Sequence, residues 1–242
     1  MDGIGYSSPG SRADSPIEYY AFPEVSPQNG PFMSRLIVIH PEDPQARLIA
    51  QVVECLKAGG IVVYPTDSSY ALGCHTGERD ALDRIRRIRN LDHTHNFSLV
   101  CRDLSEIAVY AMVDNATYRL LKACTPGPYT FILPATRQVP RRLQHPKRKT
   151  VGLRVPDNAI AQAILAELNE PMMSSTLVMP GEELPATDPY EMRDLLGDRV
   201  DIVIDGGYCG VDFTTVVDLT EGVPYVVRVG KGEADVFRAQ AG

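Results

Sequence analysis

Four hydroxyl side chains follow one short apolar run, at Thr66, Ser68, Ser69 and Tyr70. The run, Ile61–Tyr64, is apolar and rich in β-branched residues, which predicts a strand covered on both faces. The hydroxyls would then lie at the carboxyl end of a strand, where open α/β sheets bind their ligands. They supply donors and acceptors for a small polar ligand, or they only cap the end of the strand. The spacing alone leaves both interpretations open.

A single arginine, Arg154, stands inside an apolar run that spans residues 151–156. A buried guanidinium requires an anionic partner, because desolvation of an unpaired charge is expensive. The partner is either the carboxylate of a ligand or an aspartate of the chain itself.

Positive charge is concentrated in two windows, although the chain carries a formal net charge of −7. Such clusters on an acidic protein predict a local anionic ligand, which is either the phosphates of a nucleotide in a cleft or an RNA backbone. A solvated helix face and a basic loop would produce the same pattern. The first window holds Arg84, Arg86, Arg87 and Arg89, and the second holds Arg137, Arg141, Arg142, Lys147, Arg148 and Lys149.

The composition is that of a globular protein, with 242 residues of which 44% are hydrophobic and 23% charged. No apolar stretch approaches the roughly 20 residues of a membrane span, and the first residues have neither the basic flank nor the apolar stretch of a signal peptide, so we expect a cytoplasmic protein without membrane contact. The five cysteines are scattered and form no Cys-x-x-Cys pair. We therefore expect no metal held by protein ligands alone. The glycine-rich phosphate motifs are absent, so a bound nucleotide would be held by arginines and strand-end backbone.

Helical and strand patterns alternate from Pro41 onward, which predicts an α/β fold. The first 33 residues are dense in Gly, Ser, Pro and acidic residues and predict a disordered tail, followed by a single domain over 34–242. A start of translation at Met33 is one explanation of this boundary. We predict strands over 36–39, 61–64, 98–101, 129–133, 151–156, 172–179, 203–204, 215–219 and 225–229, and helices over 44–57, 80–89, 104–112, 115–124 and 159–168.

Six segments, in order along the chain, resemble one family, the YrdC-like threonylcarbamoyl-AMP synthases, and most closely its YciO-like branch. The resemblance runs from about Arg35 to Phe237. It implies a twisted, mixed α/β sheet around a concave basic cavity. The segments are Pro-Thr-Asp-Ser-Ser-Tyr-Ala-Leu-Gly (65–73), Arg-Ile-Arg (87–89), Thr-Pro-Gly-Pro-Tyr-Thr (125–130), Val-Gly-Leu-Arg-Val-Pro (151–156), Ser-Ser-Thr (174–176) and Thr-Thr-Val-Val-Asp (214–218).

The resemblance also implies an activity, the condensation of L-threonine, bicarbonate and ATP into threonylcarbamoyl-adenylate with release of pyrophosphate. Mg²⁺ would accompany the ATP, and the product would serve the modification of adenosine 37 in tRNA. Members of the family are also described as binding double-stranded RNA. The alternative is therefore a tRNA-, rRNA- or double-stranded-RNA-binding protein of translation without significant catalysis, which would use Arg137, Arg141, Arg142, Lys147, Arg148 and Lys149.

Roles carry over from the family to individual positions of this chain. Val178 departs from the family, because it stands where the synthases have the asparagine of a Ser-x-Asn motif, and a valine side chain forms no hydrogen bond. Thr176 replaces the serine of that motif, so we expect weak turnover or a shifted substrate. Arg87, Arg89 and Thr176 are the implied catalytic residues; Arg87, Arg89, Thr130, Thr176 and Arg228 the implied ATP contacts; and Ser68, Tyr70, Arg154 and Thr214 the implied threonine contacts.

Overall fold

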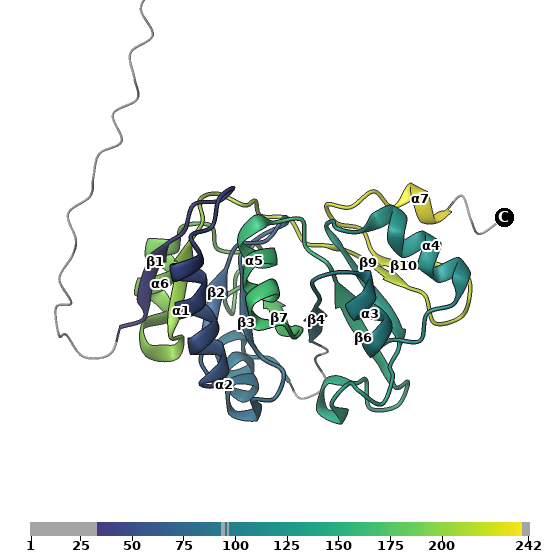
Figure 1. Cartoon of the computed structure of the whole chain (residues 1–242), viewed down its shortest axis with the longest axis horizontal. Coiled ribbons are helices and arrows are strands. Elements are labelled where there is room, and N and C mark those ends of the chain that lie inside the picture. Colours follow the sequence, from purple (N-terminus) through teal and green to yellow (C-terminus); the bar gives the residue numbers. More distant parts are fainter. Residues whose placement is uncertain (1–32, 93–94, 96, 239–242) are drawn as a thin grey trace, which may run out of the picture. The chain divides into compact units, whose positions relative to one another are not determined.

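The computed structural model describes residues 33–92, 95 and 97–238 (Figure 1). The chain divides into two units, Met1–Pro31 and Phe32–Gly242, and the described residues all belong to the second. Of the predicted tail over residues 1–33, all but Met33 lies outside the described residues.

Ten strands of the described chain form one mixed sheet in the order β1-β8-β2-β3-β7-β4-β6-β5-β9-β10. The pairs β1/β8, β8/β2, β4/β6 and β5/β9 are parallel, and the other neighbours are antiparallel. The strands are β1 (Arg35–Val38), β2 (Ile61–Tyr64), β3 (Ala71–His75), β4 (Ser98–Val100), β5 (Tyr129–Pro134), β6 (Thr150–Arg154), β7 (Met172–Thr176), β8 (Ile202–Asp205), β9 (Thr215–Asp218) and β10 (Tyr225–Arg228).

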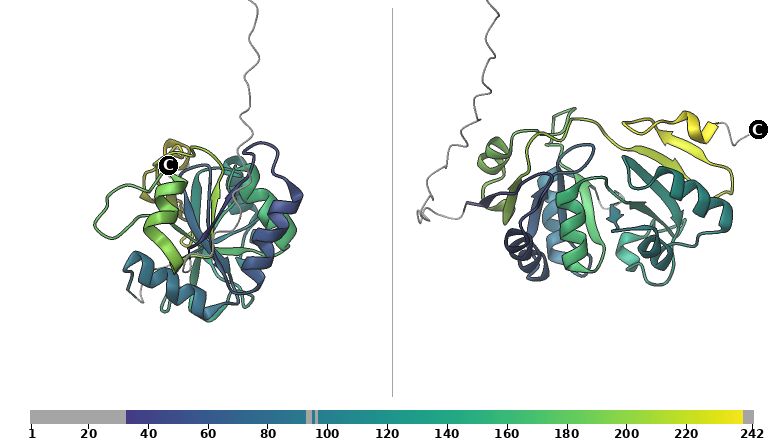
Figure 2. Two further views of the ribbon diagram at one scale, coloured as in Figure 1. Left: turned by 90° about the vertical axis from the view of Figure 1, so that its left-hand side faces the viewer. Right: turned by 45° about the horizontal axis from the view of Figure 1, so that its top comes forward.

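Helices cover the sheet from two sides. In the left view of Figure 2, α1 and α5 lie on one side of the strands and α2 and α6 on the other. The helices are α1 (Ala46–Lys57), α2 (Arg79–Arg89), α3 (Leu104–Tyr110), α4 (Asn115–Cys124), α5 (Ala159–Leu168), α6 (Pro189–Leu196) and α7 (Asp235–Arg238), with short 3-10 turns at Arg141–Leu143 and Gly197–Arg199.

The two faces of β2 belong to two different hydrophobic clusters. Val62 and Tyr64 pack into the cluster that contains α1 and α5, whereas Ile61 and Val63 pack into the cluster that contains α2 and α6. All four side chains are fully buried, as the apolar run predicts for a strand covered on both faces.

The same alternation separates core residues from residues of the opposite face in the second half of the sheet. Leu99, Leu153 and Phe131 point into the larger core cluster. Their neighbours Ser98 and Gly152 are paired across β4 and β6, and they lie on the opposite face, because successive side chains of a strand alternate. The residues on that face are small, and they are polar or lack a side chain.

β3, α6 and α7 were not predicted from the sequence, and several predicted elements end one to three residues away from their observed bounds. β3 was not predicted as a strand, because it lies inside the hydroxyl-rich motif and contains Gly73, where an added Cβ would lie 2.7 Å from the sulfur of Met172. α6 was not predicted either. It is short, and it begins where Asp188 accepts hydrogen bonds from the backbone N–H groups of Tyr190 and Glu191. No helix within the described ranges is long and apolar enough for a bilayer span.

Candidate functional site

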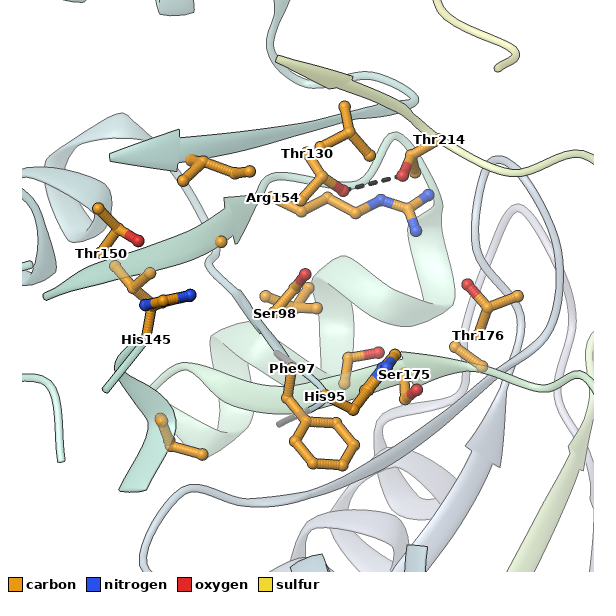
Figure 3. Close-up of a pocket in the computed structure, with 18 of the residues that line it drawn as sticks. His95, Phe97, Ser98, Thr130, His145, Thr150, Arg154, Ser175, Thr176 and Thr214 are labelled. Carbon is orange, nitrogen blue, oxygen red and sulfur yellow. Dashed lines mark hydrogen bonds between the residues drawn. The ribbon is translucent and has the colours of Figure 1, made fainter. Parts of the chain in front are cut away.

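A cavity of about 430 Å³ lies against the small, polar face of the sheet (Figure 3). Its volume is within the range of small-molecule sites. The cavity is lined by Thr150, Val151, Gly152 and Arg154 of β6, together with residues of β4, β5, β7 and β9. Four arginines, two histidines and no carboxylate are found among the described lining residues. The cavity is therefore basic, although the chain as a whole is acidic.

Arg228 is anchored at one end of this cavity. Its guanidinium donates to the carbonyl oxygen of Thr214 at 3.0 and 3.2 Å, and to the hydroxyl of Thr214 at 3.2 Å. The hydroxyls of Thr214 and Thr130 are 2.9 Å apart (Figure 3), and the guanidinium carbon of Arg228 lies 5.0 Å from the ring centre of Phe213. Burial lowers the pKa of Arg228 below its usual value. Arg228 is thus a fixed cation with neutral partners.

Arg89, the last residue of α2, reaches the cavity from another side. The helix ends there because Asn90 takes the left-handed conformation, with φ of 50°. The guanidinium donates to the hydroxyl of Ser175 at 2.5 Å and to the carbonyl oxygen of Val178 at 3.3 Å. Burial lowers the pKa of Arg89 as well.

Arg154 is held by the hydroxyl-rich loop that follows β2. Its Nη2 donates to the hydroxyls of Thr66 at 3.2 Å and Ser68 at 3.0 Å, and to a carboxylate oxygen of Asp67. The side chains of Arg154 and Asp67 are only 8% and 9% exposed. Of the two partners left open by the sequence, the structure thus contains the internal aspartate, while Arg154 also lines the cavity.

The opposite end of the cavity is formed by His145 and Thr150, away from Thr176 and Thr214, and Phe97 lies beside His95 (Figure 3). The Nδ1 atom of His145 accepts hydrogen bonds from the backbone N–H groups of residues 147 and 148. The proton of the neutral imidazole must therefore lie on Nε2, which makes His145 a fixed donor. Arg148, which also lines the cavity, pairs with Asp218 at 2.6 Å.

The structure brings many of the residues named from the sequence together. Ser68 is one hydrogen bond away from the cavity, through Arg154. Seven of the residues named from the sequence line the cavity directly, namely Arg89, Thr130, Arg148, Arg154, Thr176, Thr214 and Arg228.

Other named residues lie elsewhere. Arg87 is exposed on α2, where its Nε donates to the carbonyl oxygen of Asp83 at 3.3 Å. The hydroxyl of Tyr70 is turned to the carbonyl oxygen of Gly207 at 2.7 Å, and its side chain is fully buried. The basic residues Arg137, Arg141, Arg142, Lys147 and Lys149 are exposed and are not among the residues that line the cavity.

Several lining residues were not singled out from the sequence. Thr150 and Gly152 alternate with core residues toward Arg154, and that period of two was the signal that could have revealed them. His95 and His145 lie in loops, where no periodicity marks them. Within the described part of the chain, no group of three or more His, Cys, Asp or Glu side chains could hold a metal ion, and the five cysteines are free thiols.

Comparison with known proteins gives consistent matches. The family model Sua5_yciO_yrdC, described as "Telomere recombination", matches residues 54–230. YciO of Escherichia coli K12, itself described as uncharacterized, is 55% identical over 205 residues, which cover 85% of this chain and all of YciO. The crystal structure of E. coli YciO matches with a TM-score of 0.82 over the same shares of the two chains.

Two more distant relatives carry other names. A threonylcarbamoyl-AMP synthase of Vibrio vulnificus is 28% identical over 161 residues, which cover 65% of this chain and 86% of that protein. A variant of P. abyssi Sua5 matches with a TM-score of 0.77 and 25% identity, over 86% of this chain and 64% of that one. The predicted fold class, an α/β fold with a twisted mixed sheet of the YrdC-like type, is confirmed by these structures. With a family model over most of its length and a relative 55% identical over that relative's whole length, the chain belongs to the Sua5/YciO/YrdC family.

Proposed function

We propose that this protein is an ATP-dependent enzyme of the threonylcarbamoyl-AMP synthase type. The reaction would join L-threonine, bicarbonate and ATP into threonylcarbamoyl-adenylate, with release of pyrophosphate and water, and its product would serve tRNA modification. The observation that carries this proposal is the convergence of Arg89, Arg154 and Arg228, from three distant parts of the chain, on one cavity with threonine hydroxyls. Family membership and the relative named threonylcarbamoyl-AMP synthase support it.

The phosphates fit the end of the cavity at Arg89 and Arg228. Both guanidiniums donate to neutral oxygens, and neither has a carboxylate partner among the described residues, so each retains a full charge for an anion. Attack of a carbamate oxygen on the α-phosphorus needs no protein nucleophile. Catalysis then depends on placement and on neutralisation of the charge that develops on the phosphates. Mg²⁺ would enter with ATP as part of the substrate.

Threonine fits beside Arg154. The guanidinium would bind the carboxylate of the amino acid, and the hydroxyl of Thr214 supplies a neighbouring donor or acceptor. The hydroxyls of Thr66 and Ser68 already contact Arg154. They would therefore affect threonine indirectly, because they orient the guanidinium that binds it. Bicarbonate would lie between the amine of threonine and the α-phosphate.

The direct test is to incubate the purified protein with ATP, Mg²⁺, threonine and labelled bicarbonate and to measure the labelled adenylate and pyrophosphate. Pyrophosphate release should require both threonine and bicarbonate. Arg89→Ala should lower the rate by at least about a hundredfold, as expected for loss of one preorganised charge. Arg84→Ala is the control, because it removes the same charge from the same helix, where Arg84 pairs with Asp201. This variant should retain most of the wild-type rate. Threonine-independent ATP cleavage, or none, would count against the proposal.

A second candidate function, RNA binding, is favoured by one observation. Arg137, Arg141 and Lys147 are exposed on the segment whose residues His145 and Arg148 line the cavity. Cations beside a basic cavity fit an RNA backbone that approaches its mouth.

A further inference from the structure

The four arginines of the cavity fall into two pairs that differ in charge compensation. Arg148 and Arg154 each form an ion pair, with Asp218 and Asp67 respectively. Arg89 and Arg228 donate only to hydroxyl and carbonyl oxygens in the described structure. The cavity therefore has net positive regions and net neutral regions, although arginine lines both.

The Arg154–Asp67 pair is the more deeply buried of the two ion pairs. Both of its side chains are less than one tenth exposed, whereas Arg148 is 46% exposed. Screening by solvent is therefore weakest at Arg154, and the negative charge of Asp67 acts there at nearly full strength.

Two polar atoms of this pair remain without a partner. Nε of Arg154 and Oδ2 of Asp67 are buried, and neither forms a hydrogen bond within the described residues. Buried polar atoms without partners are uncommon in folded proteins, and each of them requires an explanation such as a functional role. In Figure 3 the guanidinium of Arg154 points toward the end of the cavity at Thr214. Arg154 thus lines the cavity at that end, and its ion-pair partner Asp67 is not among the lining residues.

A net neutral pair discriminates between ligands by their charge. A bare carboxylate or a phosphate near Arg154 is attracted by the guanidinium and repelled by the carboxylate of Asp67, while it loses its hydration. A zwitterion has a carboxylate and an ammonium group whose dipole can lie antiparallel to that of the pair. The ion pair therefore favours a ligand without net charge over an anion beside Arg154.

We propose that Asp67 is a specificity-determining residue that selects a zwitterionic α-amino acid beside Arg154 and keeps bare carboxylates and phosphates away from it. The proposal rests on the proposed function, because it takes the amino acid to bind at Arg154. It also explains how one basic cavity could orient two substrates that each carry an anionic group. Phosphates go to the uncompensated Arg89 and Arg228, and the amino acid goes to the compensated Arg154. This is selection by repulsion of the wrong ligand as well as attraction of the right one.

The test compares L-threonine with 2,3-dihydroxybutanoate, in which a hydroxyl replaces the amine. Binding of each is measured by calorimetry in the presence of an ATP analogue with a methylene bridge between the α- and β-phosphorus. The wild-type protein should prefer threonine by at least about tenfold, and Asp67→Asn should reduce that ratio by about tenfold or reverse it. Asp67→Asn should also bind inorganic pyrophosphate more tightly, because the repulsive charge is gone.

Asp218→Asn is the matched control, since it removes the same charge from the other ion pair of the cavity. It should leave the ratio of threonine to hydroxy acid within about twofold of the wild type. An unchanged ratio in Asp67→Asn would overturn the proposal. So would equal binding of the two ligands by the wild-type protein, a measurement that needs no variant to fold. If the wild type binds neither ligand, the proposed function itself fails, and the two failures are thereby distinguished.

Discussion

Val178, a position at which the family resemblance implies a departure from the synthases, contacts Arg89 through its main chain. The Nε atom of Arg89 donates to the carbonyl oxygen of Val178, a contact that any residue at position 178 can supply. The loss of a side-chain amide therefore leaves Arg89 anchored by Ser175 and by this carbonyl. Val178 is not among the residues that line the cavity. The family resemblance nevertheless implies a polar side chain here that serves the substrates, so we expect its replacement to affect turnover rather than the anchoring of Arg89.

Val178→Asn restores an amide at this position. We expect pyrophosphate release to rise by at least about tenfold, because one oriented hydrogen bond in a transition-state site changes rates by a hundredfold or more. The measurement is the rate at saturating ATP, threonine and bicarbonate. Val178→Thr, which is similar in size to valine and offers only a hydroxyl, serves as the control. An unchanged rate in Val178→Asn would show that the missing amide does not limit this protein.

The hydroxyl of Tyr64 lies 2.7 Å from that of Ser174; both residues are buried, and Ser174 also lines the cavity. Burial raises the pKa of Tyr64 to about 12, so the phenol remains protonated at neutral pH. Tyr64→Phe leaves the hydroxyl of Ser174 without this partner and should lower the free energy of unfolding by about 1 to 2 kcal/mol in urea denaturation. The double variant Tyr64→Phe/Ser174→Ala removes both polar groups. It should be more stable than the sum of the single variants predicts, and strict additivity would contradict the contact.

At the scale of the elements, periodicity was the reliable signal. Strands such as Ile61–Tyr64 and helices such as Ala159–Leu168 were predicted with their observed bounds. β3 was hidden by Gly73, and α6 by its shortness. The pairing order of the strands could not be derived, because it depends on contacts between residues far apart in sequence. The Arg154–Asp67 pair shows this for the site, since an aspartate partner was anticipated but 87 positions separate the two residues.

The stabilising contribution of the cap at the start of α3 should decrease as the pH falls. Asp103 caps this helix, and the hydrogen bond from the backbone N–H of Glu106 holds the pKa of Asp103 below its usual value. A carboxyl whose pKa is lower in the folded state stabilises the fold above its unfolded pKa of about 3.9, and this contribution is lost as the pH falls through the folded pKa. Asp103→Asn should keep the cap and its stability at pH 7. Between pH 7 and 3 it should lose less stability than the wild type, by under about 1 kcal/mol because the side chain is largely exposed. Equal losses in urea titrations at the two pH values would contradict this role.

In the described domain as a whole, positive charge is concentrated around the cavity although the net charge of the chain is negative. The chain has 31 acidic and 24 basic residues, yet the cavity collects arginines from α2, β6 and β10 and from the segment before β6. The sheet makes this possible, because it places the ends of β6, β7 and β10 around one hollow face. The basic segment 137–149 adds exposed cations next to it. Local charge, rather than the net charge of −7, should therefore govern the binding of anions.

RNA binding tests whether local charge, rather than net charge, governs the binding of a large anion. Each phosphate contact made by a cation steepens the fall of affinity with salt, by about 0.7 to 0.9 in the slope of log K against log salt concentration. If RNA docks on segment 137–149, the triple variant Arg137→Ala/Arg141→Ala/Lys147→Ala should weaken binding of a double-stranded RNA and reduce that slope by about 2 to 3. The control Arg47→Ala/Lys57→Ala/Arg119→Ala removes three exposed cations from α1 and α4 and changes the net charge equally. Fluorescence anisotropy between about 50 and 200 mM salt measures both slopes. Equal effects of the two triple variants would mean that net charge alone controls the affinity, and an unaffected slope in the first would remove segment 137–149 as an RNA surface.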